Sequence, residues 1–372
     1  MKKRIVFIGG EDISLRIPMI KSLIDLDFDV WVIGSEREEL FESASIAYSV
    51  YSLNRRFSPL SDLFSFIRLV KLLKEIQADV VHTFDTKPNI LGSFAAWLVG
   101  TPKIIKTING MGKIFSYDSK FNSLLRIIYS FSQSLTNKIS TYTIFQNSDD
   151  KQYFISKGMI ESNKAIYVPG SGVSIDLINK SIKEEAELQS LRKSLQLENK
   201  ITVILISRII KAKGIIEYLE SSALVKHHSK NVRFLLVGPI EGNEVSKADI
   251  QEYSDSCTYI GFRDDVSSLI FLSDVVVLPT YYKEGVPRCL IEGAALGKPL
   301  IATDASGCRD IVQNDENGIL INTHDVIGLS DAILKLVKYP KLREEMGKKG
   351  IDLVNEKFSL ANISASWASL YK

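Results

Sequence analysis

Several short segments of this chain are apolar at almost every position, as in Val203–Ile206 and Val275–Leu278. A strand with one face in water alternates apolar and polar residues. An uninterrupted apolar run therefore predicts a strand that is buried on both faces. Such strands are typical of parallel sheets with helices on each side. These runs are the first indication of an α/β fold.

Longer helical patterns alternate with these runs along the whole chain, which is typical of α/β domains. At about 100–200 residues per domain, 372 residues suggest two of them. We expect two Rossmann-like, doubly wound parallel-sheet domains that face each other across a cleft. Their strands are predicted near residues 4–8, 29–33, 79–83, 102–107, 141–146, 201–207, 233–238, 275–279 and 298–302.

A glycine- and proline-rich segment, Val168–Val173, suits a hinge between the domains. A charge-rich helical stretch follows at Lys180–Lys200, and a new buried strand begins at Ile201. We therefore place an N-terminal domain at residues 1–170 and a C-terminal domain at residues 171–355. Ligands of open α/β sheets bind beyond the carboxyl ends of the strands, so the cleft is the expected site.

Composition excludes several classes of protein. The chain has 46 Lys and Arg against 44 Asp and Glu, which is too balanced for a dedicated nucleic-acid binder. The three cysteines, Cys257, Cys289 and Cys308, have neither zinc-ligand nor redox spacing, and the four histidines lack an HExxH pattern. No apolar run approaches the roughly 18–20 residues of a membrane span. We expect a cytoplasmic protein without a structural metal.

Residues 51–150 hold an excess of basic residues, and the stretch Lys120–Tyr129 interleaves basic, aromatic and aliphatic side chains. Such a helix can lie on an anionic membrane surface. The same pattern also suits a helix whose apolar stripe faces the core and whose basic edge is solvated. Both interpretations stay open at this stage.

The segment from Asp274 to Asp304 carries the most chemistry. A buried strand runs into a polar turn with Glu284 and Gly285, and we place Pro287 at the first position of the following helix. That helix carries Glu292 and is predicted to end near Gly297.

The residue types in this segment suit a nucleotide-linked sugar. A helix N-terminus attracts phosphate, and Gly285 allows a ligand to approach the backbone closely. The carboxylates of Glu284 and Glu292 can accept hydrogen bonds from hydroxyl groups of a sugar and a ribose. The simpler alternative leaves both glutamates solvated on a surface helix.

A second motif follows the predicted strand at residues 201–207. Arg208 and Lys213 come after the carboxyl end of this strand, and Gly214 opens the next helix. Two cations at such a position can clamp a diphosphate. They can also neutralise the charge of a departing nucleoside diphosphate, as a metal ion does in other enzymes.

Together these motifs make the chain similar to the retaining glycosyltransferases of the GT-B type, family 4. The similarity covers the C-terminal domain. It lies in the matches Arg208, Lys213 and Gly214; Glu284, Gly285, Pro287 and Glu292 in the pattern EGxPxxxxE; Gly261–Asp264; Ser306–Asp310; Asn317 and Gly318; and the linker Gly170–Val173.

In the N-terminal domain, Val81–Gly92 and Thr107–Gly112 resemble the bacterial subgroup that builds O-antigen, capsule or lipid-linked glycans. The resemblance implies a UDP-linked hexose or N-acetylhexosamine as donor. It also implies an undecaprenyl-diphosphate-linked sugar as acceptor, and an enzyme peripheral on the inner face of the cytoplasmic membrane. Many relatives carry a histidine in the loop at Asn109–Gly112. Here Asn109 takes over its hydrogen bonds, or the subgroup does not need them. We interpret His82 as structural.

The resemblance assigns roles to individual residues. Glu284 is expected to contact the donor sugar, with Arg208 and Lys213 on the diphosphate. Further donor contacts are expected from Glu292, which binds the ribose, and from Gly285, Val286, Pro287, Arg288, Phe262, Arg263 and Gly238. The acceptor side is expected to include Gly9, Gly10, Arg16, Lys87, Asn109 and Gly110, with Arg16 and Lys87 near an acceptor phosphate.

In this family, retention is usually explained by front-face attack, in which the leaving diphosphate accepts the acceptor's proton. The resemblance therefore implies no enzymic nucleophile, metal or organic cofactor. It also implies that a C-terminal helix in residues 356–372 crosses back to the N-terminal domain.

Other enzyme classes fit less well. A nicotinamide dehydrogenase would need GxGxxG after the first strand, and a P-loop NTPase would need GxxxxGK[ST]; neither pattern is present. A sugar-nucleotide epimerase would share the architecture but carry other acid and base residues around the sugar. A non-catalytic sugar-nucleotide-binding protein would bind donor without turnover.

Overall fold

A computed structural model describes residues 2–54 and 58–372 of the chain. The chain divides into two compact units. The N-terminal unit comprises Met1–Gly172 together with Leu360–Lys372, and the C-terminal unit is Val173–Ser359. The boundaries expected from the sequence, after residues 170 and 355, lie a few residues before these divisions. No helix within the described residues is long and apolar enough to cross a bilayer.

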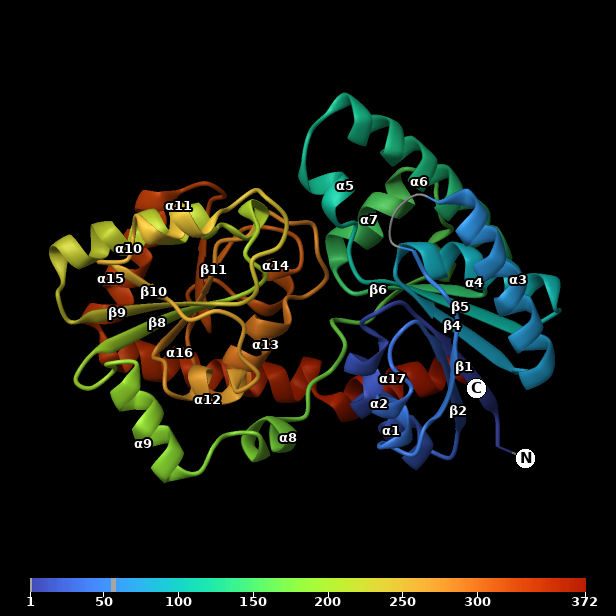
Figure 1. Ribbon diagram of the computed structural model, residues 1–372, viewed down its shortest axis with the longest axis horizontal. Coiled ribbons are helices and arrows are strands. Elements are labelled where there is room, and N and C mark those ends of the chain that lie inside the picture. The colour runs from blue at the N-terminus through green and yellow to red at the C-terminus, as the bar shows by residue number, and fades with distance from the viewer. Residues whose placement is uncertain (1, 55–57) are drawn as a thin grey trace. The chain divides into compact units, whose positions relative to one another are not determined.

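The N-terminal unit is built on a seven-stranded parallel sheet with the order β3-β2-β1-β4-β5-β6-β7 (Figure 1). Strand β1 lies in the interior of the sheet, because its residues pair with β2 on one side and with β4 on the other. The strands are β1 (Arg4–Ile8), β2 (Asp29–Gly34), β3 (Ala47–Val50), β4 (Val80–Phe84), β5 (Lys103–Ile108), β6 (Tyr142–Phe145) and β7 (Ala165–Tyr167).

Helices cover both faces of this sheet. Side chains of α3 and α4 pack on one face, and α1 and α17 pack on the other. Helix α6 lies against α4. The helices of this unit are α1 (Ile17–Asp25), α2 (Glu39–Glu42), α3 (Pro59–Ile76), α4 (Thr86–Leu98), α5 (Lys113–Ser116), α6 (Lys120–Ile139), α7 (Ser148–Ser156) and α17 (Leu360–Tyr371).

The C-terminal unit has a six-stranded parallel sheet with the order β10-β9-β8-β11-β12-β13. Its strands are β8 (Ile201–Ile206), β9 (Val232–Val237), β10 (Cys257–Tyr259), β11 (Val275–Leu278), β12 (Leu300–Thr303) and β13 (Gly318–Ile321). Its helices are α8 (Ile175–Lys180), α9 (Glu185–Ser194), α10 (Ile215–His228), α11 (Lys247–Gln251), α12 (Val266–Phe271), α13 (Arg288–Ala295), α14 (Cys308–Ile311), α15 (Val326–Lys338) and α16 (Pro340–Leu353).

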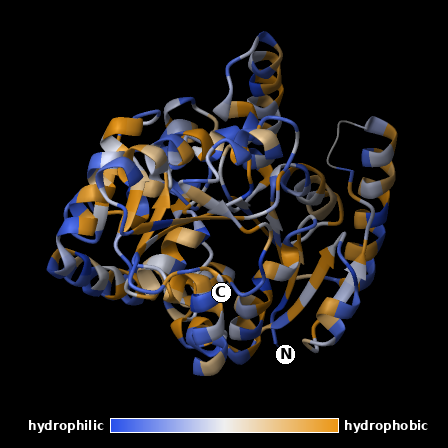
Figure 2. Ribbon diagram, turned by 60° about the vertical axis from the view of Figure 1, so that its left-hand side comes forward, coloured by the Kyte–Doolittle hydropathy of each residue, from blue (hydrophilic) through white to orange (hydrophobic). Residues whose placement is uncertain are grey.

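The apolar runs are buried on both faces, as the sequence predicts. In β11, Val275 and Val277 join the core beneath α10 and α15, whereas Val276 and Leu278 join the core beneath α13. Figure 2 shows mostly hydrophobic strands enclosed by helices that mix hydrophilic and hydrophobic residues. The prediction of two parallel-sheet α/β domains is confirmed.

The sequence did not reveal β3, β7, β10 and β13, which are the four edge strands of the two sheets. Each of these strands has only three or four residues, and such short segments are difficult to assign from their pattern alone. The stretch Lys180–Lys200 is not one helix, because the chain is non-helical between the end of α8 and the start of α9. Pro287 was also misplaced by one position, since it is the N-cap residue and α13 begins at Arg288.

Strand order fixes where a ligand can bind in each unit. In an open α/β sheet the crevice forms where the strand order reverses, beyond the carboxyl ends of the strands. This switch point lies between β1 and β4 in the N-terminal unit and between β8 and β11 in the C-terminal unit. A ligand site is therefore expected in the loops that follow these four strands.

Helix α17 is an integral part of the N-terminal unit. Trp367 is fully buried and contacts the rings of Phe7, His82 and Phe84. His82 Nδ1 lies 2.6 Å from Tyr371 Oη, and its Nε2 lies 2.7 Å from a threonine hydroxyl. Burial holds the pKa of His82 well below its usual value, so the ring is neutral. These contacts suit the structural role expected for His82.

The variant Trp367→Ala tests the contribution of α17. Deleting a fully buried tryptophan leaves a cavity, so we expect the free energy of unfolding to fall by about 3–5 kcal/mol. Trp97→Ala is the control, because Trp97 is 57% exposed, and should change stability by no more than about 0.5 kcal/mol. Urea unfolding followed by circular dichroism measures both. Equal effects of the two substitutions would contradict the packing described.

Candidate active site

The loops that follow β8 and β11 meet at the switch point of the C-terminal unit. After β8 the chain passes Arg208 and makes a single 3₁₀ turn over Lys211–Lys213. Gly214 then adopts a left-handed conformation with φ 73°, and a Cβ there would lie 2.1 Å from the carbonyl oxygen of Pro279. Only glycine allows the two loops to approach this closely.

An ion pair joins these two loops. Lys213 Nζ lies 2.5 Å from Glu284 Oε1, and the two side chains are 9% and 20% exposed. The ring of Tyr282 lies beside them, with its centroid 5.5 Å from Lys213 Nζ and 5.5 Å from Arg208 Cζ. The structure thus brings together the three residues predicted from two separate motifs, and it adds Tyr282.

Arg208 has a carboxylate partner of its own. Its Nη1 donates to Glu241 Oε2 at 2.7 Å, and both side chains are nearly half exposed. Burial alone would lower the pKa of Arg208, but Glu241 and Tyr282 together raise it above its ordinary value. The guanidinium is therefore a permanent positive charge at the carboxyl end of β8.

Glu292 lies in the first turns of α13. It accepts a hydrogen bond from Arg288 Nε at 2.7 Å, and its side chain is largely buried whereas that of Arg288 is exposed. Gly285, Val286 and Pro287 lead into this helix and are buried. The exposed guanidinium can swing away from Glu292, which would leave the carboxylate available to a ligand.

A third loop supports the turn that carries Glu284. Gly307, after β12, has φ 80°, and a Cβ there would lie 2.0 Å from the carbonyl oxygen of Gly285. Its neighbour Ser306 is buried. The hydroxyl of Thr280 donates to the carbonyl of Ala212 at 3.1 Å and so ties the loop after β11 to the loop after β8. The position of Glu284 is therefore set by loops from three strands.

Two thiols flank the ion pair. Burial raises the pKa of Cys289 to about 12, a shift that Lys213 opposes and both glutamates reinforce. Burial also raises the pKa of Cys308 well above its usual value. Both thiols are therefore protonated at neutral pH, and neither supplies the thiolate that a covalent mechanism would need.

The remaining predicted donor residues lie near the carboxyl ends of β9 and β10. Gly238 has φ 139°, and a Cβ there would overlap the carbonyl oxygen of Ser207. The close packing of the backbone therefore requires glycine at this position, whether or not a donor binds there. Phe262 is 73% exposed. Arg263 makes two hydrogen bonds to Asp265, at 2.8 and 2.5 Å.

The residues predicted for the acceptor side lie in the N-terminal unit. Gly9 packs so tightly that a Cβ would lie 2.6 Å from the side chain of Ile13. Asn109 accepts a hydrogen bond from the buried Arg16 at 3.1 Å. Lys87 forms an ion pair with Asp62 at 2.7 Å.

Gly10 lies beside Asp85, and Gly110 lines a pocket together with Asp85 and Asn109. Sequence reasoning did not single out Asp85, although it lies within a segment that carried the resemblance.

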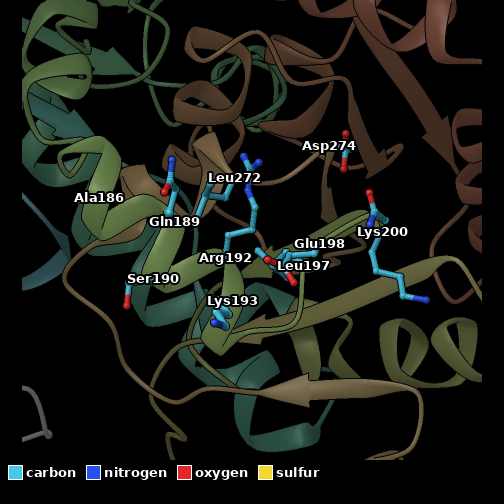
Figure 3. Close-up of a pocket in the computed structure, with 11 residues that line it drawn as sticks. Ala186, Gln189, Ser190, Arg192, Lys193, Leu197, Glu198, Lys200, Leu272 and Asp274 are labelled. Carbon is cyan, nitrogen blue, oxygen red and sulfur yellow. The ribbon is translucent and has the colours of Figure 1, made fainter.

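A hollow of about 970 Å³, larger than the pocket beside Asp85, lies in the C-terminal unit (Figure 3). It is lined by α9 residues such as Arg192 and Lys193, and by Lys200 and Asp274, which precede β8 and β11. It thus opens at the amino ends of these strands, whereas α/β sheets bind ligands at the carboxyl ends. Size alone does not make it the active site.

Comparison with protein families matches both units. Residues 4–143 match a family described as "Glycosyl transferase 4-like", and residues 188–353 match "Glycosyl transferases group 1". The chain belongs to these glycosyltransferases. The second match spans the loops after β8 and β11, with Arg208, Lys213 and Glu284, and helix α13, with Glu292.

Three relatives of this glycosyltransferase are bacterial proteins. It is 27% identical to the N,N'-diacetylbacillosaminyl-diphospho-undecaprenol alpha-1,3-N-acetylgalactosaminyltransferase of Campylobacter jejuni, over 91% of this chain and 90% of the relative. It is also 27% identical to the UDP-Gal:alpha-D-GlcNAc-diphosphoundecaprenol alpha-1,3-galactosyltransferase of Escherichia coli, over 83% and 80%. The capsular polysaccharide biosynthesis glycosyltransferase CapM of Staphylococcus aureus is 25% identical, over 96% and 94%.

Solved structures share the fold of this glycosyltransferase. A glycosyltransferase from Rickettsia africae superposes with a TM-score of 0.82 at 18% identity, covering 100% of this chain and 98% of the other. Alr3699/HepE of Anabaena, solved in complex with UDP, gives a TM-score of 0.80 at 19% identity and covers 99% of both chains. The fold is therefore GT-B.

The variant Gly307→Ala tests whether the third loop positions Glu284. The new methyl group would push the Glu284–Gly285 turn away, so we expect donor turnover to fall at least roughly tenfold. Gly242→Ala is the matched control, because Gly242 also has a positive φ of 72° but nothing lies within 4 Å of its Cβ position. Both variants carry a backbone cost of about 1–2 kcal/mol, seen as a lower melting temperature. Equal turnover in the two would contradict this positioning role.

Proposed function

We propose that this glycosyltransferase moves a hexose or N-acetylhexosamine from a UDP-linked donor to a lipid-linked saccharide, with retention of configuration and without a metal ion. One observation carries the proposal. The Lys213–Glu284 ion pair, with Arg208 beside it, lies at the carboxyl ends of β8 and β11, where the strand order of the C-terminal sheet reverses.

The donor would replace contacts that these side chains now make with each other. A diphosphate carries more negative charge than one carboxylate, so Lys213 and Arg208 would turn toward it. Glu284, still close to Lys213, could then accept hydrogen bonds from sugar hydroxyls. Glu292 would exchange the exposed Arg288 for the ribose hydroxyls. Phe262, exposed after β10, offers an aromatic face for the base.

Relatives support this choice of substrates. The names of the Escherichia coli and Campylobacter jejuni enzymes specify sugars on diphosphoundecaprenol as acceptors, and the former specifies UDP-galactose as donor. HepE, with the same fold, was solved with UDP and with UDP-glucose. The present chain aligns with each of these proteins over most of its length.

Retention is proposed to proceed by front-face attack. The bond from the anomeric carbon to the diphosphate breaks while the acceptor hydroxyl attacks from the same face, and its proton passes to the leaving diphosphate oxygen. Arg208 and Lys213 would stabilise the negative charge on that leaving group, the role a metal ion plays elsewhere. The protonated state of Cys289 and Cys308 fits a route in which no cysteine acts as a nucleophile.

Glu284→Gln and Lys213→Ala test the proposed donor site. Each removes one half of the ion pair, so we expect transfer to fall by about 10²-fold or more. The assay follows sugar transfer from UDP-hexoses and UDP-N-acetylhexosamines to polyprenyl-diphosphate-linked N-acetylglucosamine, with EDTA present, and NMR assigns the product anomer.

Lys348→Ala is the control for these variants. Lys348 forms a similar pair with Glu344, but both side chains are about two-thirds exposed, so turnover should not change. Near-normal transfer by Glu284→Gln and Lys213→Ala would overturn the site assignment. Loss of wild-type transfer on adding EDTA would contradict metal independence, and an inverted product anomer would contradict retention.

We also propose that α6 holds the enzyme on the membrane. Five large apolar side chains recur along this helix at steps of three and four residues, and all are exposed: Phe121, Leu124, Ile128, Phe131 and Leu135. Steps of three and four residues place them on one face of the helix. This exposure argues against a core-facing stripe and supports the membrane interpretation.

Charge favours a lipid surface over a second copy of the chain. Helix α6 contains Lys120, Arg126 and Lys138 but no acidic residue. Two such helices would repel each other, whereas an anionic membrane would attract both the charge and the apolar face. Arg126 contributes less than its sequence position suggests, since it donates to the carbonyl oxygens of Ile114 and Tyr117 and so binds α5.

The double variant Leu124→Ser/Phe131→Ser tests this surface. Removing two side chains that would enter the lipid should weaken binding to vesicles containing phosphatidylglycerol at least roughly tenfold. The control is Phe271→Ser/Ile327→Ser, which removes two exposed apolar side chains of the C-terminal unit. Vesicle co-sedimentation at low salt measures both. Binding that is unchanged in the α6 variant would rule out this docking surface.

A further inference from the structure

Asp85 lies at the switch point of the N-terminal sheet. It is the first residue after β4, whose neighbour β1 ends just before Gly9 and Gly10. A Cβ on Gly10 would lie 3.6 Å from Asp85 Oδ2, so the two loops are close together at the carboxyl ends of the strands. This is the position where an open α/β sheet forms its ligand crevice.

The backbone of Asp85 is strained. Its φ of 69° and ψ of 166° lie in a region that almost only glycine occupies. A non-glycine residue persists in this region where its surroundings force it there, and such residues cluster at functional sites. Glycine would remove the strain, so the presence of a carboxylate at this position calls for an explanation.

Neighbouring side chains fix the carboxylate. Asn109 Nδ2 donates to Asp85 Oδ1 at 2.8 Å, while Asn109 Oδ1 accepts from Arg16 Nη2 at 3.1 Å. The guanidinium of Arg16 is buried and lies 3.9 Å from the centre of the Phe84 ring. The relay from Arg16 through Asn109 therefore orients Asp85 and balances its charge, as a preorganised binding group requires.

A small pocket opens beside this carboxylate. It has a volume of about 110 Å³ and is lined by Asp85, Thr86, Asn109, Gly110 and Tyr129, among others. Sites that enclose a whole ligand measure about 300–1,000 Å³, so this one has room for one edge of a sugar ring. A carboxylate in such a pocket accepts hydrogen bonds from hydroxyl groups.

We propose that Asp85 binds a hydroxyl group of the acceptor saccharide, in the pocket between the loops after β4 and β5, and thereby selects the acceptor. This inference rests on the proposed transferase function and adds a residue to its acceptor side. A structural role for Asp85, limited to balancing Arg16, is the alternative that the experiment must separate.

The experiment compares Asp85→Asn, Asp85→Ala and Asp85→Gly with the wild type. Polyprenyl-diphosphate-linked N-acetylglucosamine is the acceptor probe, and the UDP-sugar that the wild type uses is the donor. We expect kcat/KM for the acceptor to fall at least tenfold in all three variants. The thermal shift caused by the donor, and the slow hydrolysis of donor in the absence of acceptor, should stay within twofold of wild type.

Glycine and alanine separate the backbone from the side chain. Both delete the carboxylate, but only glycine relieves the strain, so Asp85→Gly should melt at a higher temperature than Asp85→Ala while losing transfer equally. Wild-type kcat/KM for the acceptor in Asp85→Gly would overturn the proposal. So would a parallel loss of donor binding, or a loss of stability with an unchanged acceptor KM.

Failure of the underlying function gives a different result. A wild-type enzyme that transfers sugar to none of a panel of polyprenyl-diphosphate saccharides would refute the proposed acceptor class, and the role of Asp85 would be refuted with it.

Discussion

The ion pair between Lys213 and Glu284 depends on the parallel arrangement of β8 and β11. These strands are far apart in the sequence but adjacent in the sheet, so the loops after them must meet at the same edge. The contact is short because Gly214 lets one loop touch the backbone of the other, and because Gly307 supports the turn that carries Glu284. A largely buried cation and anion balance each other's charge there.

The same arrangement explains how the pair could take part in catalysis. Breaking a buried ion pair costs free energy unless another charge replaces the lost partner. A donor diphosphate supplies that replacement for Lys213, and sugar hydroxyls can satisfy Glu284. The site would therefore be held together by its own charges before binding and by the donor afterwards. Burial raises the pKa of both Cys289 and Cys308, and the charges of Lys213 and Glu284 act on each thiol.

The sequence predicts those parts of the structure that depend on local pattern. The central strands follow from their apolar runs. The motifs that hold Arg208, Lys213, Glu284 and Glu292 predict a site beyond the carboxyl ends of β8 and β11. The four edge strands have only three or four residues each, so their pattern does not identify them. The orientation of Arg126 could not be predicted either, because it depends on the carbonyl oxygen of Ile114 in the separate helix α5. Asp85 went unnoticed because its strain is set by tertiary contacts, which no local pattern records.

The most direct test of the account is a crystal structure of the chain with a non-hydrolysable UDP-sugar. We predict that both phosphates lie beyond the carboxyl ends of β8 and β11, within roughly 3 Å of Lys213 Nζ and of the Arg208 guanidinium. Glu284 should then contact the sugar. Phosphates bound instead in the hollow lined by Arg192, Lys193 and Lys200, with the Lys213–Glu284 pair undisturbed, would contradict it.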